Sequence, residues 1–177
     1  MRKQWVVVLL VIAVITAAAV LAVRFSADIR PVEVASQAPD FRAVNLATGA
    51  RVDLAPYRGK VVLLNIWATW CEPCRTEMPS IERLQQQLGG PDFVILAVSI
   101  DKGSSEDVRR FQHQYGLTFT ILQDASGDIQ SIYQTTGVPE SFVINREGII
   151  VKKVIGAHEW DSETERGLIR RLLAQQG

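Results

Sequence analysis

The junction between an apolar run and a cysteine pair places the strongest constraint on the fold. Residues 61–67 read VVLLNIW, with Asn65 as the only polar member, and CEPC follows at residues 71–74. A short apolar run of this kind predicts a strand covered on both faces, as in a parallel sheet. Apolar residues then recur at spacings of three and four over residues 78–88, which predicts a helix with one buried face. We therefore expect the two cysteines where a buried strand ends and a helix begins.

The rest of the chain continues this alternation. We expect a short hairpin over residues 41–54, strands at 93–100, 119–122, 142–144 and 149–155, a helix after Ser104 that ends at Gly116, and a weaker helix at 129–133. We also expect Asp161 to cap a last helix. Strands alternating with helices and ending in a hairpin and a helix predict an α/β fold. A mixed central sheet is flanked by helices and carries an N-terminal β-hairpin extension.

The first residues predict a membrane anchor. Arg2 and Lys3 precede an uncharged apolar run over residues 5–23, which as a helix has about the length of a bilayer's hydrocarbon core. The positive end should stay in the cytoplasm, so we expect a cytoplasmic N-terminus at 1–4, a transmembrane helix at 5–23, a linker at 24–36 and an extracytoplasmic domain at 37–177. A cleaved signal peptide is the alternative, although its apolar region is usually shorter.

Charge and residue counts exclude several kinds of site. Lys plus Arg and Asp plus Glu both total 19 in the 177 residues, so no basic footprint of a nucleic-acid binder is present. The chain has two cysteines and two histidines. His113 and His158 are far apart and lack ligand spacing, which argues against a zinc site. Arg75 stands where a haem attachment motif needs histidine. We expect neither a metal nor a cofactor.

A redox role for the pair has a physical basis. A four-residue ring gives a structural disulfide little loop-closure stabilisation. At the N-cap of a helix, by contrast, Cys71 benefits from the positive end of the helix, which lowers the thiol pKa. Cys71 can then attack a substrate disulfide, and the more buried Cys74 can resolve the mixed disulfide. Pro73 is tolerated because it lies in the first turn.

Two motifs carry a resemblance to a known family. WATWCEPCR after VVLLN, with Pro79 beyond it, and TGVPESFVI at residues 136–144 resemble the membrane-anchored, thioredoxin-like thiol-disulfide oxidoreductases of the TlpA, ResA and CcmG (DsbE) type. The resemblance covers roughly residues 36–175 and implies a thioredoxin fold. It also implies a cis Val138–Pro139 bond, with the backbone of Val138 pairing with an extended substrate.

The resemblance further implies a substrate-binding surface. We expect it to involve Trp70, Pro73 and Glu140 beside Val138 and Pro139. Glu140 resembles the acidic residue of the CcmG motif, whereas CEPC is ResA-like, so the subfamily stays open.

Two carboxylates are expected to set the direction of electron flow. Glu72 lies between the cysteines and Glu77 lies one helical turn beyond Cys74. Both should oppose a thiolate electrostatically and so favour a reductant. Thioredoxin has an aspartate at the position of Asn65, which cannot titrate, so Glu77 is the better candidate for proton transfer. A solvated helix face remains the alternative for Glu77.

The combined expectation is an extracytoplasmic protein disulfide reductase, monomeric and anchored in the cell membrane. By resemblance, its substrate is apocytochrome c, whose CxxCH cysteines must be reduced before haem attachment. Its electrons come from a membrane thiol carrier of the CcdA or DsbD type. Three alternatives stay open: a disulfide-forming oxidant, a non-catalytic binding or chaperone module, and a peroxiredoxin-like peroxidase. A peroxiredoxin-like peroxidase would need the pattern PxxxTxxC, which this chain lacks, because Leu64 and Ala68 stand at the Pro and Thr positions before Cys71.

Overall fold

The computed structural model describes residues 2–25 and 32–175. Contacts divide the chain into two compact units, Met1–Pro31 and Val32–Gly177. The first contains one helix, α1 (Arg2–Phe25), of 24 residues. The second holds every other helix and strand that the structure describes, and both predicted motifs.

Within the described residues, no helix offers an apolar stretch long enough to cross a membrane. The predicted anchor at 5–23 includes positions 6–9, 19, 22 and 23, whose side chains lie outside the described residues. The anchor therefore stays a prediction.

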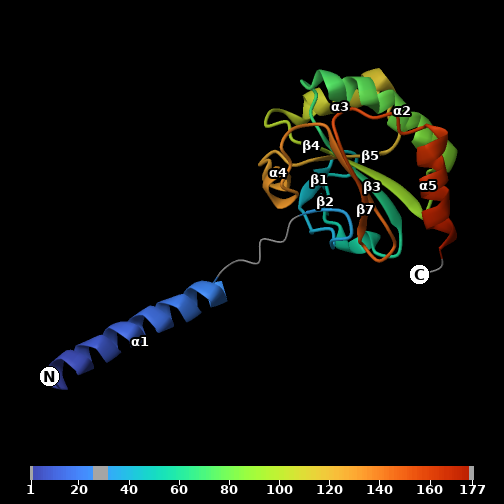
Figure 1. The fold of residues 1–177 in the computed structure, drawn as a ribbon. Coiled ribbons are helices and arrows are strands. Elements are labelled where there is room, and N and C mark those ends of the chain that lie inside the picture. The colour runs from blue at the N-terminus through green and yellow to red at the C-terminus, as the bar shows by residue number, and fades with distance from the viewer. Residues whose placement is uncertain (1, 26–31, 176–177) are drawn as a thin grey trace. The chain divides into compact units, whose positions relative to one another are not determined.

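A mixed sheet forms the centre of the second unit (Figure 1). It has seven strands, in the order β2-β1-β5-β4-β3-β6-β7. β3 pairs in parallel with β4, and β4 with β5, whereas β6 runs antiparallel to both β3 and β7. The strands are β1 (Ala43–Asn45), β2 (Arg51–Val52), β3 (Val61–Trp67), β4 (Phe93–Ser99), β5 (Thr120–Gln123), β6 (Glu140–Ile144) and β7 (Ile150–Ile155). The predicted mixed sheet and N-terminal hairpin are confirmed.

Helices cover both faces of the sheet. Side chains alternate along a strand, so Asn65 and Trp67 of β3 share one face. Glu77 of α2 (Glu72–Leu88) bonds to Asn65, and Phe111 of α3 (Ser105–Tyr115) packs on Trp67 with ring centroids 4.8 Å apart. α2 and α3 therefore cover this face. α5 (Glu163–Ala174) joins them through contacts with β3.

The opposite face of the sheet packs against the region of α4. Tyr133, which follows α4 (Asp128–Ile132), packs on Phe142 of β6 with ring centroids 4.9 Å apart, and its hydroxyl donates to the Pro39 carbonyl at 2.7 Å. A short 3₁₀ helix, η1 (Ala55–Tyr57), precedes β3.

The predicted cap of the last helix is wrong by one residue. Ser162, not Asp161, occupies the N-cap of α5, where its hydroxyl accepts from the Glu165 backbone N–H. Asp161 instead pairs with Arg83 of α2, Nε to Oδ2 at 2.5 Å. Asp and Ser are similarly good N-cap residues. Because the Asp161 carboxylate pairs with Arg83 of α2, Ser162 takes the N-cap position.

Candidate active site

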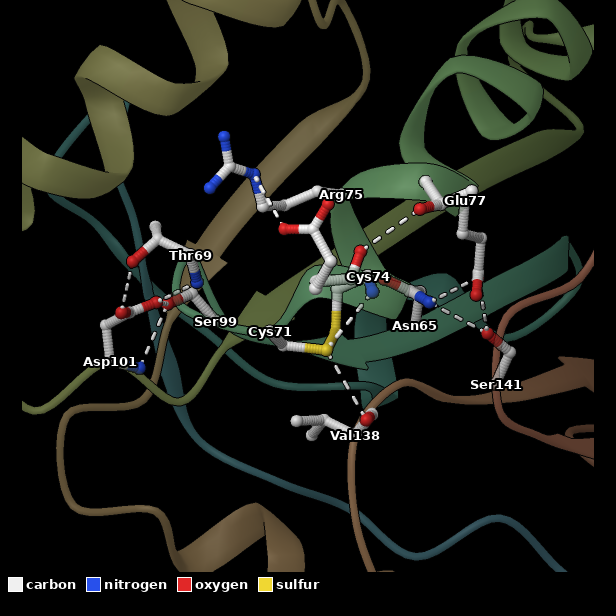
Figure 2. Close-up of a disulfide and its surroundings, with 12 residues drawn as sticks. Asn65, Thr69, Cys71, Cys74, Arg75, Glu77, Ser99, Asp101, Val138 and Ser141 are labelled. Atoms are coloured by element: carbon white, nitrogen blue, oxygen red, sulfur yellow. Dashed lines mark hydrogen bonds and ion pairs between the residues drawn. A yellow bond between two sulfur atoms is a disulfide. The ribbon is translucent and has the colours of Figure 1, made fainter.

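The cysteine pair follows the carboxyl end of β3, an inner strand of the sheet, at the start of α2 (Figure 2). Cys71 is the N-cap of α2, and the Cys74 backbone N–H donates to Cys71 Sγ at 3.1 Å. The two sulfurs form a disulfide of 2.08 Å. Cys71 retains 5% of its surface exposed and Cys74 0%. The predicted placement between a buried strand and a helix is confirmed, and Cys71 is the more exposed of the two residues.

The second motif meets the first. The Val138–Pro139 peptide bond is cis, as the resemblance implied. The Val138 carbonyl oxygen lies 3.4 Å from Cys71 Sγ (Figure 2). Pro139 is buried and Val138 is half-buried. Cys71 and Val138 are 67 positions apart in the sequence, and the fold brings the Val138 carbonyl next to the Cys71 sulfur.

Glu77 is buried, with 2% of its surface exposed. Its Oε1 accepts from Asn65 Nδ2 at 2.9 Å, from Trp160 Nε1 at 2.9 Å and from Ser141 Oγ at 3.4 Å, whereas Oε2 has no hydrogen-bond partner within the described residues. Burial raises the pKa of Glu77 to about 7, against the opposing effect of hydrogen bonds from the Trp160 side chain, the His158 backbone and the Ser141 side chain. The alternative of a solvated helix face is excluded.

The remaining predicted residues of this segment lie at the surface. Trp70 is 68% exposed, and Pro73 is also exposed. The Glu72 side chain is 82% exposed and lies 3.9 Å from Arg75 Nε. An exposed ion pair of this length is worth little, so Glu72 keeps a carboxylate free to interact with charges that approach Cys71.

Glu140 lies apart from Glu77. It directly precedes Ser141 on β6, so the two side chains point to opposite faces of the sheet, and Ser141 shares the face of Glu77. Glu140 is 1% exposed, and its Oε1 lies 3.3 Å from Lys153 Nζ of β7. The predicted contact of Glu140 with substrate stays a prediction. In the structure, Glu140 forms an ion pair with Lys153.

A buried aspartate at this site was missed. Asp101 accepts from the Thr69 backbone N–H at 2.9 Å, the Thr69 hydroxyl at 2.6 Å and the Ser99 hydroxyl at 2.6 Å (Figure 2). These bonds hold the loop that leads from β3 to Cys71. One signal was available, because Asp101 closely follows an apolar strand and the carboxyl ends of parallel strands meet at one edge.

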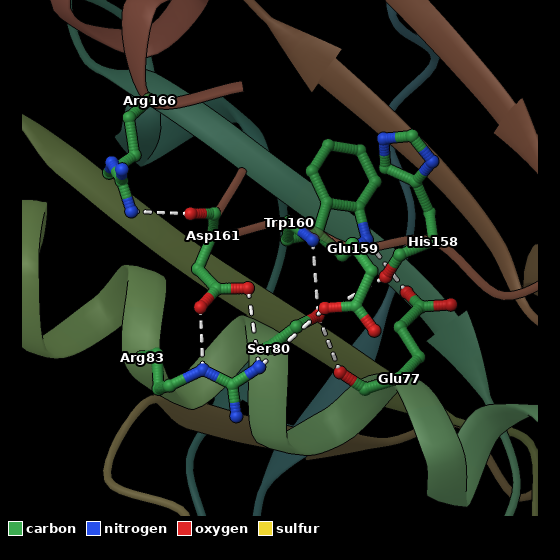
Figure 3. A network of polar contacts seen from close by, with 8 residues as sticks. All are labelled: Glu77, Ser80, Arg83, His158, Glu159, Trp160, Asp161 and Arg166. Atoms are coloured by element: carbon green, nitrogen blue, oxygen red, sulfur yellow. Dashed lines mark hydrogen bonds and ion pairs between the residues drawn. The ribbon is translucent and has the colours of Figure 1, made fainter. Parts of the chain in front are cut away.

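Trp160 was the second residue missed. It lies in the polar segment between β7 and α5, is 0% exposed, and donates its indole N–H to Glu77 (Figure 3). No periodicity marks it, and only a tryptophan within an otherwise polar stretch gave a hint. His158, which was not expected to act at the site, pairs with Glu165 at 3.0 Å.

Comparison with known proteins agrees with this geometry. Residues 34–153 match the sequence profile described as the AhpC/TSA family. The thiol-disulfide oxidoreductase ResA of Bacillus thuringiensis (strain Al Hakam) is 32% identical over 148 residues, covering 84% of this chain and 83% of the relative. The thioredoxin-like protein YneN of Bacillus subtilis (strain 168) is 40% identical over 116 residues, covering 64% of this chain and 66% of the relative.

A solved structure agrees as well. The crystal structure described as a thiol:disulfide interchange protein DsbE from Chlorobium tepidum superposes with a TM-score of 0.72 at 30% identity, covering 80% of this chain and 99% of that one. The chain thus shares its thioredoxin-like fold with proteins named for thiol-disulfide exchange.

Proposed function

The chain belongs to the AhpC/TSA family and is a thiol-disulfide oxidoreductase of the ResA and DsbE type, and on this premise we propose that it reduces protein disulfides outside the cytoplasm. The observation that carries the proposal is the buried Glu77 carboxyl one helical turn beyond the Cys71–Cys74 pair. A carboxyl group with a pKa of about 7 can both take and release a proton at neutral pH.

The reaction begins at Cys71. Its thiolate attacks one sulfur of the substrate disulfide, the substrate S–S bond breaks, and a mixed disulfide forms while the second substrate sulfur leaves as a thiolate. The Cys74 N–H that points at Cys71 Sγ and the N-terminus of α2 favour the thiolate. Trp70 and the Val138 backbone beside Cys71 form the surface that an extended substrate contacts.

Cys74 completes the turnover. Its thiol gives its proton to the Glu77 carboxylate, and the resulting thiolate attacks Cys71 Sγ. The substrate leaves with both sulfurs reduced, and the Cys71–Cys74 disulfide forms, as in the structure described here. Two electrons and two protons must then come from a donor, for which we propose a membrane thiol carrier of the CcdA or DsbD type.

The direction of electron flow follows from local charge. The helix N-terminus stabilises a thiolate, and a strongly stabilised thiolate makes an oxidant. The exposed Glu72 carboxylate and the ionised fraction of Glu77 act against that stabilisation. We therefore place the chain on the reducing side. Among disulfide substrates, apocytochrome c, with its CxxCH pair, is the one that the family resemblance favours.

We also propose that residues 5–23 hold the chain in the membrane, as a monomer with residues 37–177 on the outer side. The support is the uncharged sequence between Lys3 and Arg24 and the helical backbone of 24 residues at α1.

The full chain, reduced with dithiothreitol and freed of it, tests the proposed direction. It is mixed with an oxidised peptide that contains CxxCH, and peptide thiols are followed by mass spectrometry. We expect the peptide to be reduced as the chain becomes oxidised, with no turnover in Cys71→Ser and a trapped mixed disulfide in Cys74→Ser. Rapid oxidation of the reduced peptide by the oxidised chain, with no reaction in the other direction, would identify an oxidant instead.

A further inference from the structure

The segment between β7 and α5 is fixed to one face of the active-site helix. Three residues of α2 at spacings of three, Glu77, Ser80 and Arg83, contact it (Figure 3). Ser80 Oγ accepts from the Trp160 backbone N–H at 3.1 Å and lies 3.1 Å from the His158 carbonyl oxygen. We call residues 158–161 the clamp segment.

The far end of the clamp segment is fixed by charge. Arg83 Nε donates to Asp161 Oδ2 at 2.5 Å, and Arg83 also lies 3.6 Å from Glu159. Arg166 of α5 donates to the Asp161 carbonyl at 2.5 Å. Trp160 directly precedes Asp161, its backbone N–H is bonded to Ser80, and 0% of its surface is exposed. Its indole therefore has little freedom to move.

The two oxygens of Glu77 have different surroundings. Oε1 accepts from the Trp160 indole N–H and the Asn65 amide, both at 2.9 Å, and Ser141 Oγ lies 3.4 Å away. Oε2 is buried and has no hydrogen-bond partner within the described residues. An oxygen already accepting two short bonds is a poor site for a proton, whereas Oε2 is free to take one.

A small pocket gives Glu77 a route to water. It has a volume of about 100 Å³ and is lined by Glu77 and Thr76 of α2 and by Ala157, His158 and Glu159. A pocket of this size holds several waters, given about 30 Å³ per water in the liquid. The clamp segment thus both supplies a donor to Glu77 and lines its opening to solvent.

We propose that Trp160 is a positioning residue for Glu77, whose indole N–H holds Oε1 so that the proton of the exchange reaction is carried on Oε2. This inference rests on the proposed function for the role of Glu77, but the contact itself concerns the oxidised chain alone. Other groups in this region are His158, which pairs with Glu165, Lys152, which pairs with the same carboxylate, and Glu159. None of these side chains donates to Glu77 within the described residues. The clamp segment contributes two donors to Glu77, the Trp160 indole N–H and the His158 backbone N–H, and only the first comes from a side chain.

Trp160→Phe tests the inference, because it keeps an aromatic ring in the buried site and removes the indole N–H. It also removes ring volume, which the control substitution below matches. A donor to a charged group stabilises the carboxylate, so its loss should raise the pKa of Glu77 by about one to two pH units. The readout is the carboxyl carbon resonance of ¹³C-labelled glutamate in the oxidised full chain, assigned with Glu77→Gln. An unchanged midpoint would overturn the inference.

Trp67→Phe is the matched control. Trp67 is equally buried, and its indole nitrogen has no hydrogen-bond partner within the described residues. We expect this substitution to leave the Glu77 midpoint where it is in the unsubstituted chain. A shift as large as that of Trp160→Phe would mean that any change of buried tryptophan moves Glu77, and would also overturn the inference.

A measurement on the unsubstituted chain keeps the inference testable if Trp160→Phe does not fold. The indole N–H resonance of Trp160 should move with pH around the Glu77 midpoint, and this movement should vanish in Glu77→Gln. An indole resonance that ignores pH would contradict the proposed bond. Because no substrate is present, failure of the reductase proposal appears only in the peptide assay, whereas failure of this inference appears only here.

Discussion

Replacing Glu77 by glutamine should change how stability depends on pH. Glu77 is 2% exposed, and its pKa in the folded chain is about 7, against an ordinary value of 4.5. The folded state therefore binds this proton more tightly than the unfolded state. The stabilisation is fully present below pH 4.5 and is lost as pH rises through about 7. Glutamine cannot ionise, and its carbonyl oxygen can still accept from Trp160 and Asn65.

The size of the effect follows from proton linkage. One pH unit of pKa difference corresponds to about 1.36 kcal/mol. With the two pKa values above, the ionisation of Glu77 costs the folded state about 2.5 kcal/mol between pH 5 and pH 8. The unfolding free energy of Glu77→Gln minus that of the unsubstituted chain should grow by about this amount over the same range.

Urea unfolding of the oxidised full chain, followed by circular dichroism at a series of pH values, measures this difference. Contributions from other titrating groups cancel when the two proteins are subtracted. Glu72→Gln, at an 82% exposed side chain of the same helix, is the control, and its difference from the unsubstituted chain should stay nearly constant with pH. If Glu77→Gln also gives a constant difference, the account of Glu77 as a buried, proton-exchanging carboxyl is refuted.

Two further substitutions test the supports of the site. Asp101→Ala leaves the part-buried Thr69 backbone N–H and the buried Ser99 hydroxyl without this acceptor, and it should lower the unfolding free energy by about 3 kcal/mol. Asp107→Ala, at an exposed carboxylate, should stay within about 0.5 kcal/mol, and equal losses would refute the role of Asp101. Lys153→Met leaves the buried Glu140 carboxylate without its cation and should cost about 3 kcal/mol or more at neutral pH. Adding Glu140→Gln should recover most of that loss, and no recovery would contradict the pairing.

The fold followed from sequence where the signal was local. The apolar run at 61–67 and the spacing of apolar residues after Cys74 depend only on near neighbours, and β3 and α2 appear where the patterns placed them. The hairpin at the front and the one between β6 and β7 were also marked by local turn residues, with Gly49 and Gly148 both at positive φ. The limits of the strands differ by a residue or two from those expected.

The surroundings of Glu77 could not be read in the same way. Its position one turn beyond Cys74 fits a buried or a solvated face equally well. Burial is decided by Asn65, Ser141 and Trp160, which lie 12, 64 and 83 positions away in sequence. No local sequence pattern indicates contacts at these separations. Glu77 could therefore be identified as a candidate from its sequence position, but its burial and its hydrogen-bond donors are visible only in the structure.

Glu140 illustrates the opposite limit. The motif placed it beside Pro139, which is where it lies, but the alternation of β6 turns its side chain away from the face of Glu77 and towards Lys153. The position of a residue in a motif therefore does not determine on which face of the sheet its side chain lies. The register of the neighbouring strands does.

The reduction potential of the Cys71–Cys74 pair tests the central claim most directly. The full chain is equilibrated in dithiothreitol or glutathione buffers of known potential, and the fraction of reduced cysteines is measured by alkylation. We predict a potential near or below that of thioredoxin, about −270 mV, which is where a protein disulfide reductase belongs. A potential near about −120 mV, as for the periplasmic oxidant DsbA, would contradict the proposed direction of electron flow and the roles given to Glu72 and Glu77.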